Sequence, residues 1–523
     1  MAEKIQSKTP EEPYCCLGQN LPGKDQKEIY QKVENKAIME DKRGKYVCFC
    51  GKNQTTDLPV GKKEDFCKMK LRTRGISGTR NQAESERERA HRVIARKAAA
   101  EGIVLLENNG VLPLKKGSNV ALYGGGARHT IKGGTGSGSV NNRSNVSIDE
   151  GLRNAGFTVT TDTWLDAYDA AYGQSYKEWK DYIYEISEPG NFDSLYRAHA
   201  SHPMQMPKGS AITKTEAADA IYVISRISGE GADRKAEPGD YYLSEQEEEE
   251  LKAITECYDN TIVILNVGGV MDVSFLEKYN IAALVMLSQA GMEGGNALAD
   301  VLSGAVTPSG KLTDTWGCHY EDYPSSATFS HNNGNIIEEK YYEGIYVGYR
   351  YFDSFEVEPR YPFGYGMSYT TFDVATENAA WKPDAESKTI TVTVKVTNTG
   401  SCAGKEVVQI YAACPFGKLK KERKRLVAFG KTALLQPGES ETLHLKVPTV
   451  LLESYRTGKA VYCMEAGDYD FLVGTSSRDV TLAARLTLDK TVETEHLTNI
   501  CPLLDALKEI QPEEEKEDRE DAE

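Results

Sequence analysis

Three short, continuous runs of apolar residues constrain the fold of this chain more than any other feature. Residues 220–226 read AIYVISR, residues 261–267 read TIVILNV and residues 281–288 read IAALVMLS. Glycine-rich or helical stretches bound each run, and each is largely continuous rather than alternating in polarity. Strands of this kind are buried on both faces, which is typical of a parallel sheet covered by helices. The sequence therefore predicts an α/β sandwich domain with a parallel sheet over residues 83–320.

The segments between these runs complete the predicted domain. The stretch 84–107 is Ala-rich, carries its charges early and predicts one helix, which Asn-Asn-Gly ends at 108–110. Ser244 predicts an N-cap, because an acidic turn follows it. The other predicted elements are strands at 118–123 and 157–161, and helices at 165–185, 244–258 and 292–303.

The apolar pattern changes to alternation after residue 371. Residues 389–400 read TITVTVKVTNTG and residues 405–414 read KEVVQIYAAC, with Asn-Thr-Gly and Pro-Gly marking turns. Several short strands of this kind predict an all-β sandwich over residues 372–488. A connector rich in Tyr and Gly, residues 321–371, joins it to the α/β domain.

The two ends of the chain have a different character. Residues 1–82 hold seventeen Lys and Arg against eleven Asp and Glu, in a chain of net charge −16. Five cysteines lie there without a C-x-x-C pair, and no histidine precedes His91, so we expect reduced thiols in an extension of unknown role rather than zinc. Residues 489–523 predict a short helix at 495–510 and an acidic tail too charged to fold alone.

Composition argues against several classes of binding partner and indicates a cellular compartment. The acidic balance argues against nucleic acid. No run of 18 apolar residues predicts a membrane helix, and the N-terminus lacks an apolar signal region. Eleven cysteines, an odd number without a disulfide pattern, fit a reducing compartment. We therefore expect a cytoplasmic protein without a membrane partner.

Two glycine-rich loops can be compared with known nucleotide-binding motifs. Gly124-Gly125-Gly126 follows a predicted strand, but the third glycine of the dinucleotide fingerprint would fall at His129. The loop 132–139 reads KGGTGSGS and lacks the Gly-Lys-Ser/Thr ending of a phosphate loop. A nucleotide-dependent enzyme is therefore disfavoured, and we expect no cofactor and no metal.

A carboxylate follows the first apolar run. The sequence 226–235 reads RISGEGADRK and places Glu230 between two glycines. Loops at the carboxyl ends of strands carry chemistry in α/β proteins, and glycine neighbours leave a carboxylate unshielded. From this loop alone, a solvated glutamate is the alternative. The alternative acids nearby are Asp233, Glu237 and Asp240. We expect Arg226, Arg234 and Lys235 to form ion pairs that shape the loop rather than to act as catalysts.

Several segments together resemble one family. SRISGEGADRK, RKAAAEGIVLLENNGVLPL, KGGTGSGSVN and YYEGIYVGYRYFD are similar to segments of glycoside hydrolase family 3, the β-glucosidase-like hydrolases, over about residues 84–510. The resemblance implies hydrolysis of O-glycosyl bonds in a β-glucoside or related oligosaccharide, on an α/β sandwich followed by a fibronectin type III-like domain. It also implies that Glu230 is the general acid/base. The implied substrate-pocket rim is Lys132, Thr135, Ser137, Ser139 and Arg226.

Other parts of the family pattern are missing from these residues. In the family that the chain resembles, the nucleophile is an Asp in a Ser-Asp-Trp context on a separate (β/α)₈ barrel, and a Lys-His pair binds the sugar. The sequence has no Ser-Asp and no Lys-His dipeptide, and no unassigned stretch reaches the roughly 250 residues of a barrel. The domain order resembles the circularly permuted branch, where the barrel comes last. We expect a hydrolase part that is active only with a complementary barrel chain, or else an inactive remnant or carbohydrate-binding module.

Overall fold

The computed structural model describes residues 83–500 and 507–512, apart from 228–229, 231–232, 332–333 and 385–387, together with two short strands before them. The chain divides into a unit of residues 1–85 and a unit of residues 86–523. The first unit carries an antiparallel strand pair, β1 (Ile38–Glu40) with β2 (Tyr46–Cys48). The rest of the predicted extension and its other cysteines lie outside the described residues, as does the acidic tail 513–523.

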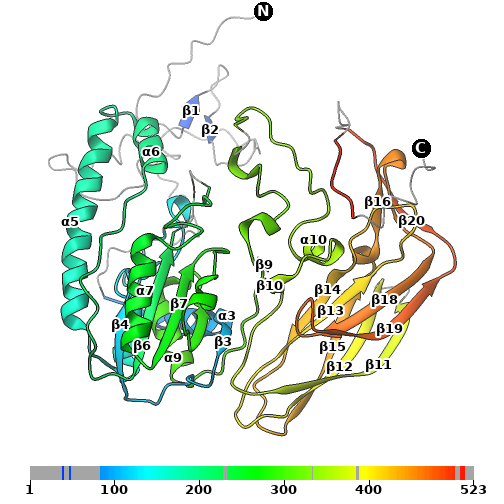
Figure 1. Cartoon of the computed structure of the whole chain (residues 1–523). Helices are drawn as coiled ribbons and strands as arrows, with labels where there is room; N and C mark the ends of the chain where they lie inside the picture. Colours follow the sequence, from blue (N-terminus) through cyan, green and yellow to red (C-terminus); the bar gives the residue numbers. More distant parts are fainter. Residues whose placement is uncertain are drawn as a thin grey trace, which may run out of the picture. The chain divides into compact units, whose positions relative to one another are not determined.

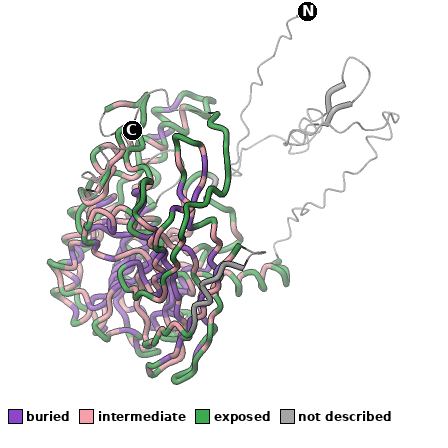
Figure 2. The backbone as a smooth tube through the Cα atoms, turned by 90° about the vertical axis from the view of Figure 1, so that its right-hand side faces the viewer, coloured by how far each residue is buried: buried purple, intermediate pink, exposed green. Residues whose placement is uncertain are grey.

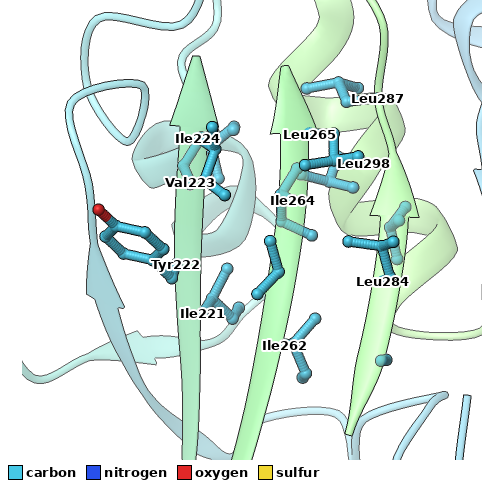
Figure 3. Close-up of a cluster of buried hydrophobic side chains, with 14 of the residues drawn as sticks. Ile221, Tyr222, Val223, Ile224, Ile262, Ile264, Leu265, Leu284, Leu287 and Leu298 are labelled. Carbon is cyan, nitrogen blue, oxygen red and sulfur yellow. The ribbon is translucent and has the colours of Figure 1, made fainter. Parts of the chain in front are cut away.

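A six-stranded sheet forms the centre of the α/β domain, in the order β3-β8-β7-β6-β4-β5 (Figure 1). The strands from β8 to β5 run parallel to their neighbours. The predicted runs at its centre are confirmed as buried strands, whose aliphatic side chains pack together (Figure 3). The strands are β3 (Val104–Asn108), β4 (Asn119–Tyr123), β5 (Thr158–Val159), β6 (Asp219–Arg226), β7 (Asn260–Val267) and β8 (Ala283–Met286).

The edge strand β3 corrects two predictions. The expected single helix at 84–107 is instead α3 (Glu86–Gly102) followed by β3, which is antiparallel to β8. The helix ends at Gly102, a residue with low helix propensity, and the next four residues are buried and apolar. These residues gain more from pairing with β8 than from extending an exposed helix. The sheet is therefore mixed rather than wholly parallel.

Helices flank the sheet (Figure 1). One of them begins at the N-cap that the sequence predicted, Ser244. The predicted cap is confirmed: the Ser244 hydroxyl accepts the Glu247 amide, while the Glu247 carboxylate accepts the Ser244 amide at 2.9 Å. Among the described residues, no helix is long and apolar enough to cross a membrane. The helices are α4 (Ile148–Asn154), α5 (Asp162–Ile186), α6 (Phe192–Ser201), α7 (Glu245–Cys257), α8 (Phe275–Lys278), α9 (Gly294–Leu302) and α10 (Tyr349–Ser354).

Two further sheets form the predicted β-sandwich, which is confirmed. One has the order β11-β12-β15 and the other β14-β13-β18-β19. Inward positions of β12 are buried and alternate with less buried ones, as the period of two predicts. The strands are β11 (Phe372–Asp384), β12 (Thr389–Asn398), β13 (Val407–Ala413), β14 (Arg425–Lys431), β15 (Ser440–Pro448), β18 (Gly467–Gly474) and β19 (Val480–Leu488).

Each domain has its own cluster of buried apolar side chains, and buried stretches of backbone run through the interior (Figure 2). Ion pairs join the domains at the end of α3. Glu101 accepts from Lys405 and, at 2.5 Å, from Lys431, and Lys311 lies 2.9 Å from Glu406. The two domains of this unit are therefore packed against each other through charged contacts as well as through the connector.

The predicted helix at 495–510 is wrong where it can be tested. Residues 495–496 belong to β20 (Val492–His496), which pairs with β17 (Val461–Met464) beside β16 (Ser454–Arg456). Residues 507–512 are described and are not helical, while 501–506 lie outside the described residues. Pairing with an exposed strand edge has overridden a weak local helix pattern.

Candidate functional site

The neighbouring strands β4 and β6 point their carboxyl ends toward the same edge of the sheet, and β6 continues to Arg226, beyond the end of β4. The strands are parallel neighbours in register, with Tyr123 opposite Tyr222. The loop after β4 contains the glycine-rich segment, and the loop after β6 contains Glu230. In parallel α/β sheets, ligands bind in the crevice outside this edge. The topology thus brings both predicted segments to one place.

Glu230 and the glycine-rich loop meet at Gly136. A β-carbon built on Gly136 would lie 2.8 Å from the Glu230 β-carbon and would overlap its carboxylate. Gly136 also has φ of +75°, a conformation that other residues rarely adopt. Glycine is therefore required there both for the turn and for the approach of Glu230. The exposed Glu230 side chain is placed against this loop rather than away from it.

A pocket of about 740 Å³ lies beside this contact. Its volume is in the range that holds small-molecule ligands. The loop after β4 provides most of the wall, and Ile227 adds a residue from the loop after β6. The lining residues are Arg128, His129, Thr130, Ile131, Lys132, Gly133, Gly134, Thr135, Ser139, Asn145, Ser147, Asp149, Glu150 and Ile227.

Three of the five residues predicted for the pocket rim line this pocket: Lys132, Thr135 and Ser139. The Lys132 ammonium donates to the Val140 carbonyl at 2.5 Å and to the Asn142 side chain, so it closes its own loop. Ser137 lies in the short 3-10 helix Gly136–Gly138, and its side chain is outside the described residues.

Arg226 is placed elsewhere, and it does not line the pocket. Its side chain is buried and binds both carboxylate oxygens of Glu247 at 2.7 Å. It also donates to the carbonyls of Ser225, Asp240 and Tyr242. With these hydrogen bonds, the Arg226 guanidinium holds the loop after β6 against α7. The loop-shaping ion pair expected for Arg226 is thus present.

The alternative acids near Glu230 differ in their surroundings. Asp240 is committed to structure: its carboxylate accepts from Arg234 Nε and from the Lys235 amide, both at 2.7 Å. Asp233 and Glu237 are exposed. Neither these three carboxylates nor Glu230 lines the pocket. Glu230 differs from the other three in lying against Gly136, which belongs to the loop that forms most of the pocket wall.

The sequence did not reveal one wall of the pocket, a charged cluster around Arg128. Its guanidinium binds Asp149, Asp166 and Asp169 at 2.7–2.9 Å. Burial alone would lower the pKa of Arg128, but these hydrogen bonds raise it above its usual value. Arg128 is therefore a fixed cation. Its partners lie on α4 and α5, far from Arg128 in the sequence, so no local motif predicts the cluster.

His129 extends this wall. Its Nε2 lies 2.9 Å from Asp169 Oδ1, and its ring stacks on Tyr172 with 3.8 Å between the ring centroids. Both partners lie on α5. Among the described residues, no group of three or more His, Cys, Asp or Glu side chains could hold a metal ion. Arg128, His129, Asp149 and Glu150 are the charged or titratable side chains on this side of the pocket.

Comparison with known proteins identifies the family. The Glycosyl hydrolase family 3 C-terminal domain matches residues 103–369, just over half of the chain, and a Fibronectin type III-like domain matches residues 406–477. The chain belongs to glycosyl hydrolase family 3. The family resemblance and the fold predicted from the sequence are therefore confirmed.

Relatives in the family are β-glucosidases. The chain is 36% identical to Beta-glucosidase A of Butyrivibrio fibrisolvens, over 78% of this chain and 52% of that protein. It is 38% identical to Beta-glucosidase of Ruminococcus albus, over 76% of this chain and 41% of that protein. The chain thus spans about half the length of these relatives.

Solved structures of family 3 enzymes share the fold. A β-glucosidase from Paenibacillus barengoltzii is 37% identical with a TM-score of 0.68, and the match covers 80% of this chain and 45% of that one. β-Glucosidase 3B from Thermotoga neapolitana, in complex with α-D-glucose, is 36% identical with a TM-score of 0.65 over 79% of this chain and 56% of that one.

Proposed function

We propose that this chain supplies the acid/base half of a retaining β-glucosidase site, with Glu230 as the general acid/base. Glu230 protonates the departing glycosidic oxygen and then takes a proton from the water that attacks the glycosyl-enzyme. The substrate is a β-glucoside or a related oligosaccharide, as the names of the relatives suggest.

One observation carries this proposal: the Glu230 side chain lies against Gly136, beside the 740 Å³ pocket at the carboxyl edge of the sheet. The exposed position suits a group that must reach a substrate oxygen. Thr135 and Ser139 of the adjacent loop offer hydroxyls, and Lys132 holds that loop closed.

The second carboxylate comes from elsewhere in this proposal. Retaining glycosidases need two carboxyl groups about 5–5.5 Å apart, one of them a nucleophile. The Ser-Asp context of the family nucleophile does not occur in these 523 residues. We therefore infer that a (β/α)₈ barrel outside these 523 residues, for example on a complementary chain, supplies the nucleophile, and we expect these residues alone to be inactive.

The test is reconstitution. The chain is assayed on an aryl β-glucoside alone, with a family 3 barrel added as a second chain, and with the barrel joined to it. Turnover is expected only with the barrel, and Glu230→Gln should abolish it for poorly activated substrates. Full activity of Glu230→Gln would rule out the assignment and direct attention to Asp233 or Glu237.

A binding measurement separates this proposal from its alternative. The isolated chain presents only part of the sugar site, so calorimetry should detect weak or no binding of glucose. Micromolar binding by the isolated chain would instead favour a carbohydrate-binding module. Failure of every barrel combination to hydrolyse the substrate would favour a remnant without turnover.

A further inference from the structure

A polar side chain lies near the carboxyl end of β7, an otherwise largely apolar strand at the centre of the sheet. Asn266 lies one residue before the end of β7 and is fully buried. A buried amide without hydrogen-bond partners would destabilise the fold, so its partners explain why it is tolerated. Those partners all lie at the carboxyl edge of the sheet, where the site is.

The Asn266 amide joins the loops that follow β4 and β8 to a residue near the end of β6. Its Oδ1 accepts the Ile131 amide at 2.7 Å, and its Nδ2 donates to the Ile131 carbonyl at 2.9 Å and to the Ser288 carbonyl at 2.7 Å. The Ser225 hydroxyl donates to Oδ1 at 3.4 Å. Ile131, Ser225 and Ser288 belong to the segments at the ends of β4, β6 and β8. Both donors and the acceptor of the amide are used.

The contact with Ile131 leads to Glu230 through the glycine-rich loop. Lys132 follows Ile131; its carbonyl accepts the Gly291 amide at 2.9 Å, and its ammonium closes the loop onto Val140. The closed loop presents Gly136 to the Glu230 side chain. A continuous set of contacts thus links the Asn266 amide, the glycine-rich loop and the candidate acid.

We propose that Asn266 is a positioning residue for Glu230: its amide fixes the glycine-rich loop against which the Glu230 side chain lies. The catalytic meaning of this assignment rests on the proposed function. A general acid must stay within hydrogen-bond reach of the oxygen that it protonates, and small displacements lower rates steeply. A loop held at its base by two hydrogen bonds to one residue limits such displacement.

The amide group itself is required. Aspartate has nearly the same shape, but its carboxylate cannot donate to the carbonyls of Ile131 and Ser288. Asn266→Asp therefore removes the two hydrogen bonds that Nδ2 donates, with little change in volume, and leaves an acceptor for the Ile131 amide. Leaving those carbonyls without donors in a buried place adds to the effect.

The chain offers a matched control in the β-sandwich. Asn398 is also fully buried, and its Nδ2 donates to the carbonyls of Cys402 at 2.8 Å and Leu435 at 2.9 Å. Its Oδ1 accepts the Thr370 hydroxyl at 2.8 Å and the Gly400 amide at 3.1 Å. Asn398→Asp makes the same chemical change with the same number of lost donors, away from the pocket.

Hydrogen exchange on the full chain tests the clamp without any activity. In Asn266→Asp, peptides over 131–142 should exchange about ten-fold faster or more, because a hydrogen bond that holds the glycine-rich loop is lost. Peptides over 227–240 should also exchange faster, because Glu230 lies against that loop. Peptides over 389–398 should be unchanged. Asn398→Asp should give the reverse pattern. Unchanged exchange at 131–142 would overturn the clamp, and loosening there without loosening at 227–240 would overturn its coupling to Glu230.

Kinetics with the barrel present distinguish positioning from stability. Asn266→Asp should lower turnover of poorly activated glucosides more than that of activated ones, as displacement of an acid requires. Asn398→Asp should affect both equally. An equal loss in Asn266→Asp would overturn the proposal. If even the unmodified chain is inactive with every barrel, the proposed function fails, while hydrogen exchange still tests the clamp.

If Asn266→Asp does not fold, Asn266→Ser replaces it in both experiments, because serine keeps a hydroxyl for the Ile131 amide.

Discussion

Glu230 lies against Gly136, so the loops that follow the neighbouring strands β4 and β6 meet at one carboxylate. A glycine with positive φ at this point does two things at once: it allows the turn of the short 3-10 helix, and it leaves room for the glutamate. The identity of residue 136 should therefore control where the candidate acid sits.

Gly136→Ala tests this control. The added methyl group would overlap the Glu230 carboxylate and strain the backbone, which should destabilise the chain by about 1–2 kcal/mol. Displacement of Glu230 should lower turnover of poorly activated glucosides, with the barrel present, by roughly ten- to hundred-fold.

Gly138→Ala is the matched control for that variant. A β-carbon at Gly138 meets no atom within 4 Å, and this glycine closes the same 3-10 helix. Its activity and denaturation midpoint should stay close to those of the unmodified chain. Equal losses in both variants would mean that the loop as a whole is sensitive, and the specific contact with Glu230 would lose its support.

Much of the fold and part of the site could be predicted from local patterns. The apolar runs of β6, β7 and β8, the Ser244 cap and the alternation in β12 are signals that neighbours in sequence carry. Glu230 and the glycine-rich loop follow predicted strands, where α/β proteins place functional groups, but their roles were predicted from the family resemblance. These elements required no knowledge of distant contacts.

The rest depends on partners far apart in the chain. The stretch after Gly102 looked helical until its pairing with β8 was known, and Arg128 finds its carboxylates on α4 and α5. Asn266 did leave a signal: one amide in a buried apolar strand must have buried partners. The sequence could not say that one of those partners was Ile131, at the base of the glycine-rich loop.

The buried pair Lys421–Glu465 should be a major support of the β-sandwich. Lys421 is 1% exposed, and its ammonium contacts the Glu465 carboxylate, which also accepts the Lys418 amide at 2.9 Å. Lys421→Met leaves that carboxylate without its cation and should lower the free energy of unfolding by about 3–5 kcal/mol in denaturant titrations.

A second variant checks the cause. Adding Glu465→Gln to Lys421→Met removes the uncompensated charge but keeps an acceptor for the Lys418 amide, so part of the stability should return. No recovery would mean that lost packing, not charge, explains the single variant. Burial raises the pKa of Glu465, but the Lys421 bond lowers it below its usual value. The contribution of the pair is therefore present above about pH 4.5 and is lost as the pH falls further.

His199 should make the packing of α6 on α5 sensitive to acid. Its ring meets Trp179 edge-on, with 4.6 Å between the centroids, and burial lowers the pKa of His199 below its usual value. The folded state therefore favours neutral histidine. The contribution is complete above about pH 6.5 and falls as the pH drops below that value, because the unfolded chain binds the proton more readily.

The comparison for this prediction is His199→Gln, which does not titrate. The stability difference between the unmodified chain and the variant should shrink from pH 7.5 to pH 5, measured by thermal unfolding with tryptophan fluorescence. A difference that is constant over this range would refute the assignment to His199. Other titrating groups cancel, because both proteins contain them.

Limited proteolysis tests the domain limits predicted from the sequence. The composition of residues 1–82 and the charge of the acidic tail predict the first cuts there, in the second case after Pro512. Residues 83–320 and 372–488 should survive as fragments, because each contains its own buried apolar cluster. Early cleavage inside 261–290, the centre of the sheet, would refute this domain map.

The dependence on the leaving group examines Glu230 most directly. With the barrel present, Glu230→Gln should lose turnover of a poorly activated glucoside by about 10²–10⁴-fold, the usual contribution of general acid catalysis. An activated aryl glucoside needs little protonation, so its glycosyl-enzyme should still form, and the water step that requires a general base becomes limiting. Azide attacks that intermediate without a base, so it should restore turnover of the activated substrate and yield a glucosyl azide.

An Asp233→Asn variant, which keeps Glu230, should behave like the unmodified chain with and without azide. If azide rescues Asp233→Asn and not Glu230→Gln, Asp233 is the acid/base instead.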